Sequence, residues 1–445
     1  MLSSALRAAD PEALVRAHLH ASARSLRVAG LSHRWGSGRV ALVAVGKAAS
    51  RMARAAEDVL GARLDEGLVV DVADTVDVRA RRLLAGHPVP DERGQAAAAE
   101  VLRLARALGP RDLLLLLVSG GASALLPAPV DGVSLADKAE ATRRLLHAGA
   151  SIHELNAVRK HLSRLKGGGL ARAAAPARVA SLVLSDVVGD DLSTIASGPV
   201  SPDPTTYADA LAVLRRRGVA ETVPAAVLRH LEAGARGDRA ETPKRGDPAF
   251  RRVRAAIVGS NRLSLAAAEG EARALGLRTL VLTSRLEGEA REVARALVSV
   301  LRECVEEGRP EAPPACLLAG GETTVTVRGG GQGGRNQELV TAAVEPLAAL
   351  GAPGVVASLA TDGRDGNSDA AGGVVDDATL GRARALGLAP PGVFLEGSDS
   401  RNFLGPLGGL IVTGPTGTNV VDVTLLLAGG RKMAARGRKR YTRLG

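Results

Sequence analysis

Two basic side chains in this sequence follow glycines at positions suited to an anion. Lys47 follows Gly46 at the start of an expected helix, where its charge opposes the helix dipole unless an anion lies there. Arg335 follows the glycine-rich run 329–334 and opens another expected helix, beside N–H groups that should be free. Lysine is rare in this arginine-rich chain, so we interpret Lys47 as an anion ligand, with surface decoration as the alternative.

A further glycine turn, Ser119-Gly120-Gly121, follows the apolar run 113–118. Its hydroxyl and backbone N–H groups suit an anion nest, because glycine lets the backbone approach a ligand closely. A hydrolase nucleophile would require the pattern G-x-S-x-G, and the residues around Ser123 lack the last glycine. The pattern therefore favours anion binding over a nucleophile.

A helix expected over residues 152–166 carries cations beside its apolar stripe and ends at a run of glycines. Asn156 should lie on the face opposite the stripe, and Arg159 and Lys166 should share one flank. These two cations could clamp a carboxylate or a phosphate. A solvated basic face explains the pattern equally well.

Two groups of aspartates suit Mg²⁺, which binds one or two carboxylates and fills its shell with water and phosphate oxygens. The first group lies in the long loop after an expected strand at 179–184: Asp186, Asp190 and Asp191. The second follows an expected strand at 355–360: Asp362, Asp365 and Asp369. Turn formation is the alternative role for each of them. No histidine-rich set in the sequence favours zinc.

Short β-type runs alternate with amphipathic helices along the chain, which predicts an α/β fold with parallel βαβ units. Expected strands lie at 40–45, 67–72, 113–118, 179–184, 255–258, 279–283, 316–319, 323–328 and 355–360, and expected helices at 47–60, 93–108, 152–166, 260–275 and 288–307.

We expect two domains, each a largely parallel sheet flanked by helices, with the active site in the cleft between them. A Rossmann-like domain should occupy residues 1–235 and a second α/β domain residues 253–430. Glycine and proline between them, at 236–252, indicate a linker. Residues 431–445 form a basic tail that we expect to be a solvated, disordered end rather than a binding arm.

Composition excludes several classes of function. The net charge is +11, but much of it belongs to the tail, and the chain has one Trp, two Tyr and three Phe, too few for stacking on single-stranded nucleic acid. The longest apolar run, 113–118, is far too short to span a bilayer. We therefore expect a cytoplasmic protein that binds no nucleic acid and no membrane.

The run 329–334 also matches the dinucleotide pattern G-x-G-x-x-G. That pattern wants an acidic residue about twenty positions further on, and Asp362 comes too late. In so glycine-rich a chain the match is weak, and Arg335 with the polar residues after it is the more informative part.

Many short motifs together make this chain resemble one family. They are Val45-Gly46-Lys47-Ala48, Gly86-His87-Pro88-Val89-Pro90-Asp91, Ser119-Gly120-Gly121, the segment Asn156 to Ser163, Lys166-Gly167-Gly168, Leu184-Ser185-Asp186, Gly189-Asp190-Asp191, Ala196-Ser197-Gly198-Pro199, Gly321-Glu322-Thr323-Thr324-Val325, Gly334-Arg335-Asn336-Gln337-Glu338, Thr361-Asp362-Gly363 and the segment Thr413 to Asn419. Over almost its whole length the chain resembles the glycerate 2-kinase family with a MOFRL domain, historically also labelled hydroxypyruvate reductase. Small departures at Ala122, Asn367 and Val421 concern local loop shape.

The resemblance implies transfer of the γ-phosphoryl group of ATP to the 2-hydroxyl of D-glycerate, giving 2-phosphoglycerate, with Mg²⁺. Phosphoryl transfer depends mainly on positioning and positive charge and needs no covalent nucleophile, which suits these residues. The candidate catalytic residues are Lys47, Arg335, Asp186 and Asp190, and the candidate metal ligands are Asp190 and Asp362. The candidate substrate- and nucleotide-binding residues are Ser119, Gly120, Gly121, Asn156, Arg159, Lys166, Glu322, Asn336 and Thr416. We expect glycerate and ATP as small-molecule partners, with a homodimer as the candidate assembly.

Two other functions are kept as alternatives. An NAD(P)H-dependent hydroxypyruvate reductase would explain the old label and the match at 329–334. A sugar-acid-binding regulator is the non-enzymatic alternative, and the abundance of acidic loop residues near the expected anion site counts against it. An assay with glycerate and ATP, beside NADH oxidation with hydroxypyruvate, separates these functions.

Overall fold

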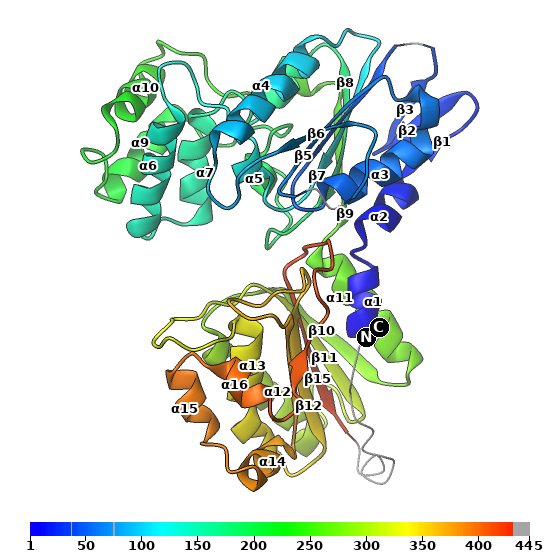
Figure 1. Cartoon of the computed structure of the whole chain (residues 1–445), viewed down its shortest axis with the longest axis vertical. Coiled ribbons are helices and arrows are strands. Elements are labelled where there is room, and N and C mark those ends of the chain that lie inside the picture. The colour runs from blue at the N-terminus through cyan, green and yellow to red at the C-terminus, as the bar shows by residue number, and fades with distance from the viewer. Residues whose placement is uncertain (37, 74–75, 430–445) are drawn as a thin grey trace. The chain divides into compact units, whose positions relative to one another are not determined.

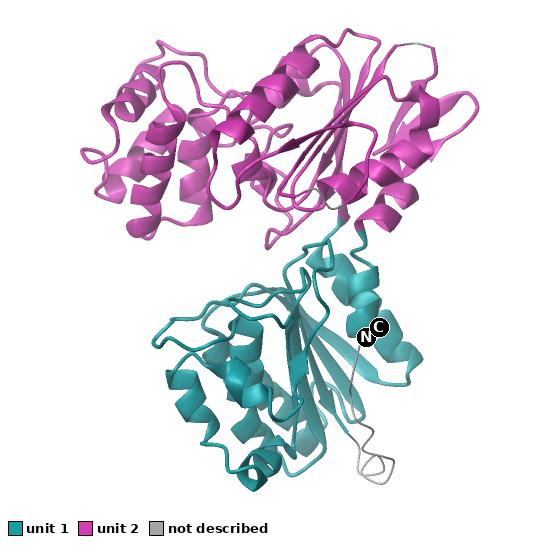
Figure 2. Cartoon of the chain, viewed as in Figure 1, with its two compact units in different colours: residues 1–10, 259–445 teal, residues 11–258 magenta. Residues whose placement is uncertain are grey.

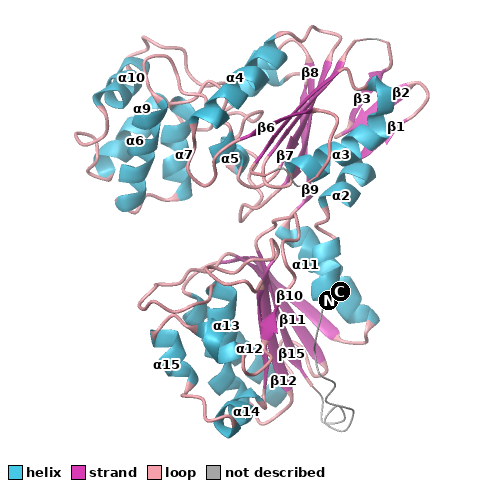
Figure 3. Ribbon diagram, in the orientation of Figure 1, coloured by secondary structure: helices cyan, strands magenta, loops and turns pink. Residues whose placement is uncertain are grey.

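A computed structural model of the chain describes residues 1–36, 38–73 and 76–429. The chain forms two compact units, one of residues 11–258 and one of residues 1–10 together with the chain from 259 onward (Figure 2). Each unit contains a six-stranded sheet with helices packed against it (Figures 1 and 3), so the predicted α/β class is confirmed. The predicted basic tail at 431–445 lies outside the described residues.

The sheet of the unit 11–258 has the strand order β6-β5-β4-β7-β8-β9. Its strands are β4 (Val40–Val45), β5 (Glu66–Asp71), β6 (Arg81–Leu84), β7 (Leu113–Val118), β8 (Arg178–Leu184) and β9 (Val253–Gly259). The pairings from β6 to β8 are all parallel. Every residue of β4 and β7 is buried, as expected for continuous apolar runs in a parallel sheet covered on both faces.

Helices on the two faces of this sheet build its core (Figure 1). One face packs against α4 (Glu92–Arg106) and α8 (Gly169–Ala174), and the other face packs against α3 (Ala49–Leu60). The short α5 (Ala122–Leu125) follows β7 directly, and α2 (Pro11–His18) lies against α3. A small antiparallel sheet is formed by β1 (Leu19–Ala21), β2 (Ser25–Val28) and β3 (Leu31–Arg34).

A separate group of helices lies beside the sheet in the same unit (Figure 1). It consists of α6 (Leu135–His147), α7 (Ile152–His161), α9 (Tyr207–Arg216) and α10 (Ala225–Ala235), which share an apolar core. Ser151 and Glu154 form a capping box that fixes the start of α7. The sequence predicted one helix over 152–166, but α7 ends at His161, so Arg159 and Lys166 do not share a helix flank.

The sheet of the other unit has the order β10-β11-β15-β12-β13-β14. Its strands are β10 (Arg278–Leu286), β11 (Ala315–Gly321), β12 (Gly354–Ala360), β13 (Gly372–Asp376), β14 (Leu410–Ile411) and β15 (Asp422–Ala428). Only the β10–β11 pairing is parallel among these described strands, so this sheet is mixed rather than largely parallel as expected. The reason is that β15 returns between β11 and β12 and runs antiparallel to both.

Two helix layers cover this mixed sheet (Figure 1). One face packs against α12 (Ala290–Glu307) and α13 (Arg335–Ala348), with α14 (Thr379–Ala385), α15 (Pro391–Glu396) and α16 (Ser400–Leu404) completing the core. The other face packs against α11 (Asn261–Ala274), which also contacts the N-terminal helix α1 (Leu2–Arg7).

The sequence predicted a linker at 236–252, but the structure places this segment within the unit 11–258. The Glu241 carboxylate accepts hydrogen bonds from His161 Nε2 at 2.9 Å and from the Tyr207 N–H at 3.1 Å. Lys244 Nζ donates to the Thr205 carbonyl. These bonds attach the segment to α7 and α9, and the division between the units follows residue 258.

The strand predicted at 323–328 is also absent, although its alternating threonines and valines are typical of a strand. Its backbone bonds to loops instead: the Thr324 N–H donates to the Gly288 carbonyl at 2.8 Å, and the Thr326 N–H to Glu289 Oε1 at 2.7 Å. Only an isolated bridge joins Thr324 to Glu289.

Across the residues that the structure describes, no helix is both long and apolar enough to cross a membrane.

Candidate active site

The loops that follow β4 and β7 are bound together at the carboxyl edge of the parallel sheet. The Lys47 N–H donates to the Gly120 carbonyl at 2.9 Å, and the Ala48 N–H donates to Ser119 Oγ at 3.0 Å. The helix α3 begins only at Ala49, so Lys47 lies in the turn before the helix. Lys47 is exposed. The structure thus brings Lys47 and Ser119 together, as parallel strands that end at one edge allow.

Gly120 and Gly121 are the two glycines of this turn, and neighbouring groups approach both of them closely. A Cβ at Gly120 would overlap the Asp186 carboxylate, and Gly121 has the left-handed φ of +83°. Within the described residues, neither N–H group makes a hydrogen bond. Two adjacent unpaired N–H groups beside a lysine are typical of an anion nest.

His87 is a residue of this cluster that sequence reasoning left without a role. A Cβ at Gly121 would lie 3.1 Å from His87 Nε2 and 3.4 Å from Lys47 Cγ, so both side chains border the glycine turn. Partial desolvation lowers the pKa of His87, and the positive charge of Lys47 lowers it further. The motif around Gly86 was the available signal, and only the fold places it beside Gly121.

A buried chain of hydrogen bonds continues from this turn into the unit. Lys166 Nζ donates to the Ser123 carbonyl at 2.7 Å and lies 2.9 Å from Ser123 Oγ. Ser123 Oγ lies 2.8 Å from Ser197 Oγ, which donates to Asn156 Oδ1 at 2.9 Å. These hydrogen bonds connect two predicted residues, Asn156 and Lys166, through Ser123 and Ser197, which were not predicted as site residues.

Asn156 is the last residue in this series of hydrogen bonds, and its amide NH₂ group has no acceptor among the described residues. Asn156 is 3% exposed, and its Nδ2 has no hydrogen-bond partner in the described part of the chain. Leaving a buried donor unpaired costs about 1–3 kcal/mol, so such groups in native proteins usually serve a ligand or an ordered water. The sequence placed Asn156 on the helix face opposite the apolar stripe, but in the structure its side chain is buried.

Three basic side chains lie near one another in this region. Burial lowers the pKa of Lys166 well below its ordinary value, and the charges of Lys138 and Arg159 lower it further. Burial also lowers the pKa of Lys138 to about 7, with Arg159 again contributing. Arg159 and Lys166 are therefore electrostatic neighbours, although they do not lie on one helix. An anion bound here would relieve this mutual repulsion.

The aspartates of the long loop divide into two kinds. Asp191 forms a turn, because its carboxylate accepts from the Ser193 N–H at 2.9 Å and from Thr194 Oγ1 at 2.8 Å. Asp190 has the left-handed φ of +58°, and its carboxylate makes no hydrogen bond to the described residues. Backbone strain of this kind is a common feature of functional positions.

In the other unit, Arg335 lies between two carboxylates. Its Nε and Nη2 donate to Asp422 at 2.5 and 3.0 Å, and its Nη1 donates to Glu322 at 2.7 Å. Burial raises the pKa of Asp422 to about 6, although the Arg335 hydrogen bonds and charge lower it. Burial alone would lower the pKa of Arg335, but its bonds to Asp422 and the surrounding carboxylates give a net increase.

The N–H groups at the start of α13 are not free, contrary to our expectation. The Asp365 carboxylate accepts the Asn336 N–H at 3.1 Å and the Gln337 N–H at 2.8 Å, and it also accepts both side-chain amides. The remaining Asn336 amide oxygen accepts from Ser358 Oγ at 2.6 Å. Asn336 is 1% exposed, so in this structure its side chain holds the helix start together.

Asp362 and Thr416 lie in two interlocked turns of the same unit. Thr416 Oγ1 donates to the Thr361 carbonyl at 2.6 Å, and the Thr416 N–H to the Asp362 carbonyl at 3.3 Å. The Asp362 carboxylate accepts from the Arg364 N–H at 3.1 Å and is half-buried. No group of three or more metal-binding side chains occurs among residues 1–36, 38–73 and 76–429.

The run 329–334 is not a dinucleotide turn. β11 ends at Gly321 and α13 begins at Arg335, so the run does not connect a strand directly to a helix. Its N–H groups also bind protein acceptors: Gly331 donates to the Gly397 carbonyl at 3.2 Å, Gln332 to Asp399 Oδ1 at 2.8 Å and Gly333 to Asn367 Oδ1 at 2.9 Å. A pyrophosphate would have to displace these bonds.

Glycine turns at the carboxyl edge of a parallel sheet, with lysine and unpaired N–H groups, are typical of α/β proteins that bind small anions. Residues 1–232 match a domain of unknown function (DUF4147), and residues 315–422 match the MOFRL family. The chain is 43% identical to the D-glycerate 2-kinase of Thermotoga maritima over 397 residues, 87% of this chain and 90% of that protein. It is 42% identical to a putative hydroxypyruvate reductase of Agrobacterium vitis over 398 residues, 88% of each chain.

The crystal structure of a glycerate kinase from Thermotoga maritima has the same fold, with a TM-score of 0.84 and 39% identity, covering 96% of this chain and 97% of that one. This chain therefore belongs to the glycerate 2-kinase family with DUF4147 and MOFRL domains.

Proposed function

We propose that this chain transfers the γ-phosphoryl group of ATP to the 2-hydroxyl of D-glycerate, giving 2-phosphoglycerate. The observation that carries the proposal is the glycine turn with the unpaired N–H groups of Gly120 and Gly121, bordered by Lys47. Preorganised donors of this kind stabilise the charge that develops on phosphate oxygens during transfer. The names of the Thermotoga maritima relative and of the crystal structure support the same activity.

Each cluster has a part in this reaction. Lys47 and the Gly120–Gly121 turn bind the anionic substrate or the transferring phosphate, and the Asn156 amide donates to a substrate oxygen. Asp186, which lies against Gly120, orients the attacking hydroxyl. In the other unit, hydrogen bonds to Asp422 and Glu322 fix the orientation of the Arg335 guanidinium. Two of its five N–H groups make no bond to the described residues and remain for a phosphate or carboxylate.

We assign Mg²⁺ to Asp190 and Asp362, whose carboxylate oxygens are the donor type that this ion prefers. The Asp190 carboxylate, which makes no hydrogen bond to the described residues, fits a metal ligand. Held by these carboxylates, Mg²⁺ would supply positive charge that offsets the charge of the ATP phosphates. An active site between the two domains, a cytoplasmic location and a homodimer stay predictions.

Hydroxypyruvate reduction is the second candidate function. It would require a nicotinamide site, and the run 329–334 was its main support in the sequence. The backbone donors of that run bind Gly397, Asp399 and Asn367 instead, which counts against reduction.

The test uses the full chain with D-glycerate, ATP and Mg²⁺. ADP release is followed by a coupled assay, and enolase added to the product reveals 2-phosphoglycerate. A parallel reaction contains hydroxypyruvate with NADH or NADPH. We expect ADP and an enolase-reactive product, with no nicotinamide oxidation above the rate of a Lys47→Ala control. Nicotinamide oxidation without ADP release would refute the kinase and support the reductase.

A further inference from the structure

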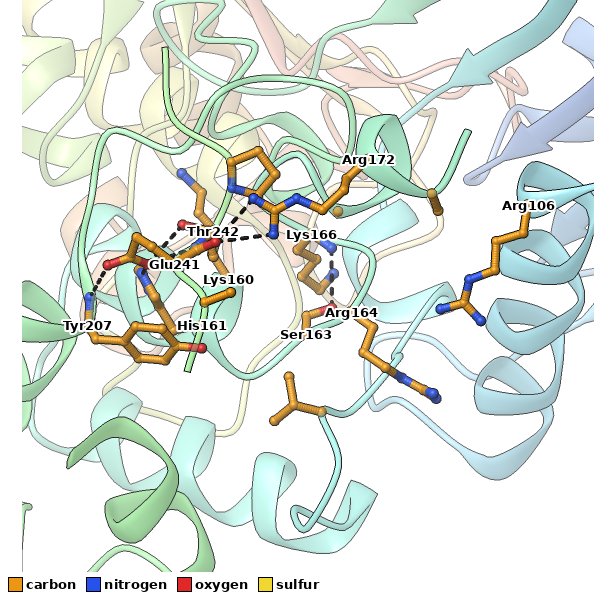
Figure 4. Close-up of a pocket in the computed structure, with 15 residues that line it drawn as sticks. Arg106, Lys160, His161, Ser163, Arg164, Lys166, Arg172, Tyr207, Glu241 and Thr242 are labelled. Atoms are coloured by element: carbon orange, nitrogen blue, oxygen red, sulfur yellow. Dashed lines mark hydrogen bonds and ion pairs between the residues drawn. The ribbon is translucent and has the colours of Figure 1, made fainter. Parts of the chain in front are cut away.

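A basic pocket lies in the unit 11–258, where α4 and α8 meet the chain that follows α7. Its volume is about 420 Å³. The walls come from the end of α4, from residues 160–166, from α8 and from residues 240–243 (Figure 4). Five cations line it: Arg106, Lys160, Arg164, Lys166 and Arg172. The only acidic residue in the lining is Glu241.

Glu241 supplies one negative charge against five basic side chains, and other groups already bond to its carboxylate. It accepts from His161 Nε2 at 2.9 Å and from the N–H groups of Tyr207 and Thr242 at 3.1 and 2.8 Å. Burial raises the pKa of Glu241, but the hydrogen bonds to it prevail and lower this pKa to about 2. Arg172 donates hydrogen bonds to the main-chain carbonyl of Glu241 and none to the Glu241 carboxylate.

Two of the cations are satisfied within the protein. Lys160 pairs with Asp203 at 3.3 Å, and both side chains are almost completely buried. Arg172 pairs with Asp247 at 3.2 Å. These pairs fix the inner wall of the pocket and keep its polar groups in one arrangement.

The guanidinium groups of Arg106 and Arg164 have no comparable partner. The Arg106 guanidinium makes no hydrogen bond or ion pair with the residues the structure describes. Arg164 approaches only Asp131 at 3.8 Å, and that carboxylate is 92% exposed, so the pair is weak. Figure 4 shows both guanidinium groups on the side of the pocket away from Glu241 and His161. Two guanidinium groups on one side of a pocket are suited to a multivalent anion.

We propose that this pocket is a second anion site, which binds a small polyanion such as a phosphate or a polycarboxylate between Arg106 and Arg164. The only residue it shares with the candidate active site is Lys166, whose Nζ bonds to Ser123 on the other side. An anion bound in the pocket could therefore alter the hydrogen bonds between Lys166 and Ser123 in the candidate active site.

Calorimetric titration of the full chain with inorganic phosphate, and separately with citrate, tests the proposal. The Lys47→Ala variant removes the main cation of the candidate active site, so the probe that this variant still binds should occupy the pocket. Adding Arg106→Gln and Arg164→Gln should weaken binding by about tenfold or more. Arg111→Gln, an exposed arginine outside the pocket lining, is the matched control and should change nothing. The stronger of the two probes identifies the class of polyanion.

Three results would overturn the proposal. The first is that neither probe binds to the Lys47→Ala variant. The second is that binding is unchanged by the arginine substitutions. The third is that D-glycerate or ATP displaces the probe in competition, which would make the pocket part of the substrate site. If the double variant does not fold, the single Arg106→Gln variant, at an exposed position, gives the same comparison.

Discussion

Arg335 binds Asp422 through two of its nitrogens, with Nε at 2.5 Å and Nη2 at 3.0 Å from the carboxylate. The start of α13 and the start of β15 are thereby joined by a planar pair. Lysine carries the same charge but cannot form this fork.

Replacing Arg335 by lysine should therefore reduce activity. We expect kcat/KM for glycerate phosphorylation to fall by about 10- to 100-fold, because a lysine ammonium has three N–H groups instead of five and cannot present a planar fork to a ligand. Steady-state kinetics measure the effect, and thermal unfolding checks the fold. A fully active Arg335→Lys protein would show that bidentate geometry is not needed.

Activity should depend on the protonation of Asp422. Burial raises its pKa to about 6 from an ordinary value of 3.8, although Arg335 opposes the rise. Above about pH 6 the carboxylate is charged and holds Arg335, so kcat/KM should rise through this pH. The Asp422→Asn variant should lack this step in the pH–rate profile.

Stability should change in the opposite direction over the same range. Because the folded pKa of Asp422 is higher than the unfolded one, the folded chain binds this proton more tightly. Its contribution to stability is complete below about pH 4 and is lost as pH rises through about 6. Urea unfolding of wild type and Asp422→Asn between these values measures it; identical pH dependence in both proteins would contradict the shift.

Replacing Lys47 by alanine should cost about 3 kcal/mol or more in kcat/KM, the range for losing one preorganised charge. Its main-chain bond to Gly120 does not involve the side chain, so the fold should persist. Arg54→Ala on the exposed face of α3 is the matched control. Normal kinetics in a folded Lys47→Ala protein would remove Lys47 from the site.

Asn156→Ala should separate activity from stability. The substitution removes a buried donor that has no partner among the described residues, together with the Oδ1 that accepts from Ser197, and Ser197 keeps its contact with Ser123. We expect a loss of about tenfold or more in kcat/KM with little change in Tm. A large drop in Tm with normal kinetics would mean that Asn156 serves the fold alone.

Metal dependence should distinguish the aspartates. Asp190→Asn and Asp362→Asn should raise the Mg²⁺ concentration needed for half-maximal rate, whereas Asp186→Asn should lower kcat at saturating Mg²⁺. Asp191→Asn is the control, because Asp191 forms a turn and should affect stability instead. Unchanged Mg²⁺ dependence in both ligand variants would place the metal elsewhere.

The sequence alone determined the local elements and the loops that carry chemistry. The fully apolar runs at β4 and β7 were predicted to the residue, because a strand buried on both faces requires continuous apolar side chains. Glycine then marks where such a strand ends and the backbone can approach a ligand, which is why Lys47 and the Ser119 turn could be located.

Tertiary structure alone decided which of these groups meet. Ser123 and Ser197 are far apart in the sequence, yet their hydroxyls lie 2.8 Å apart, and no local pattern encodes such a contact. Likewise, Asp365 takes the N–H groups that a helix start seemed to offer, because a carboxylate brought by another loop satisfies them. Local spacing specifies periodicity and turns, whereas burial, pKa shifts and unused donors depend on neighbours that only the folded chain supplies.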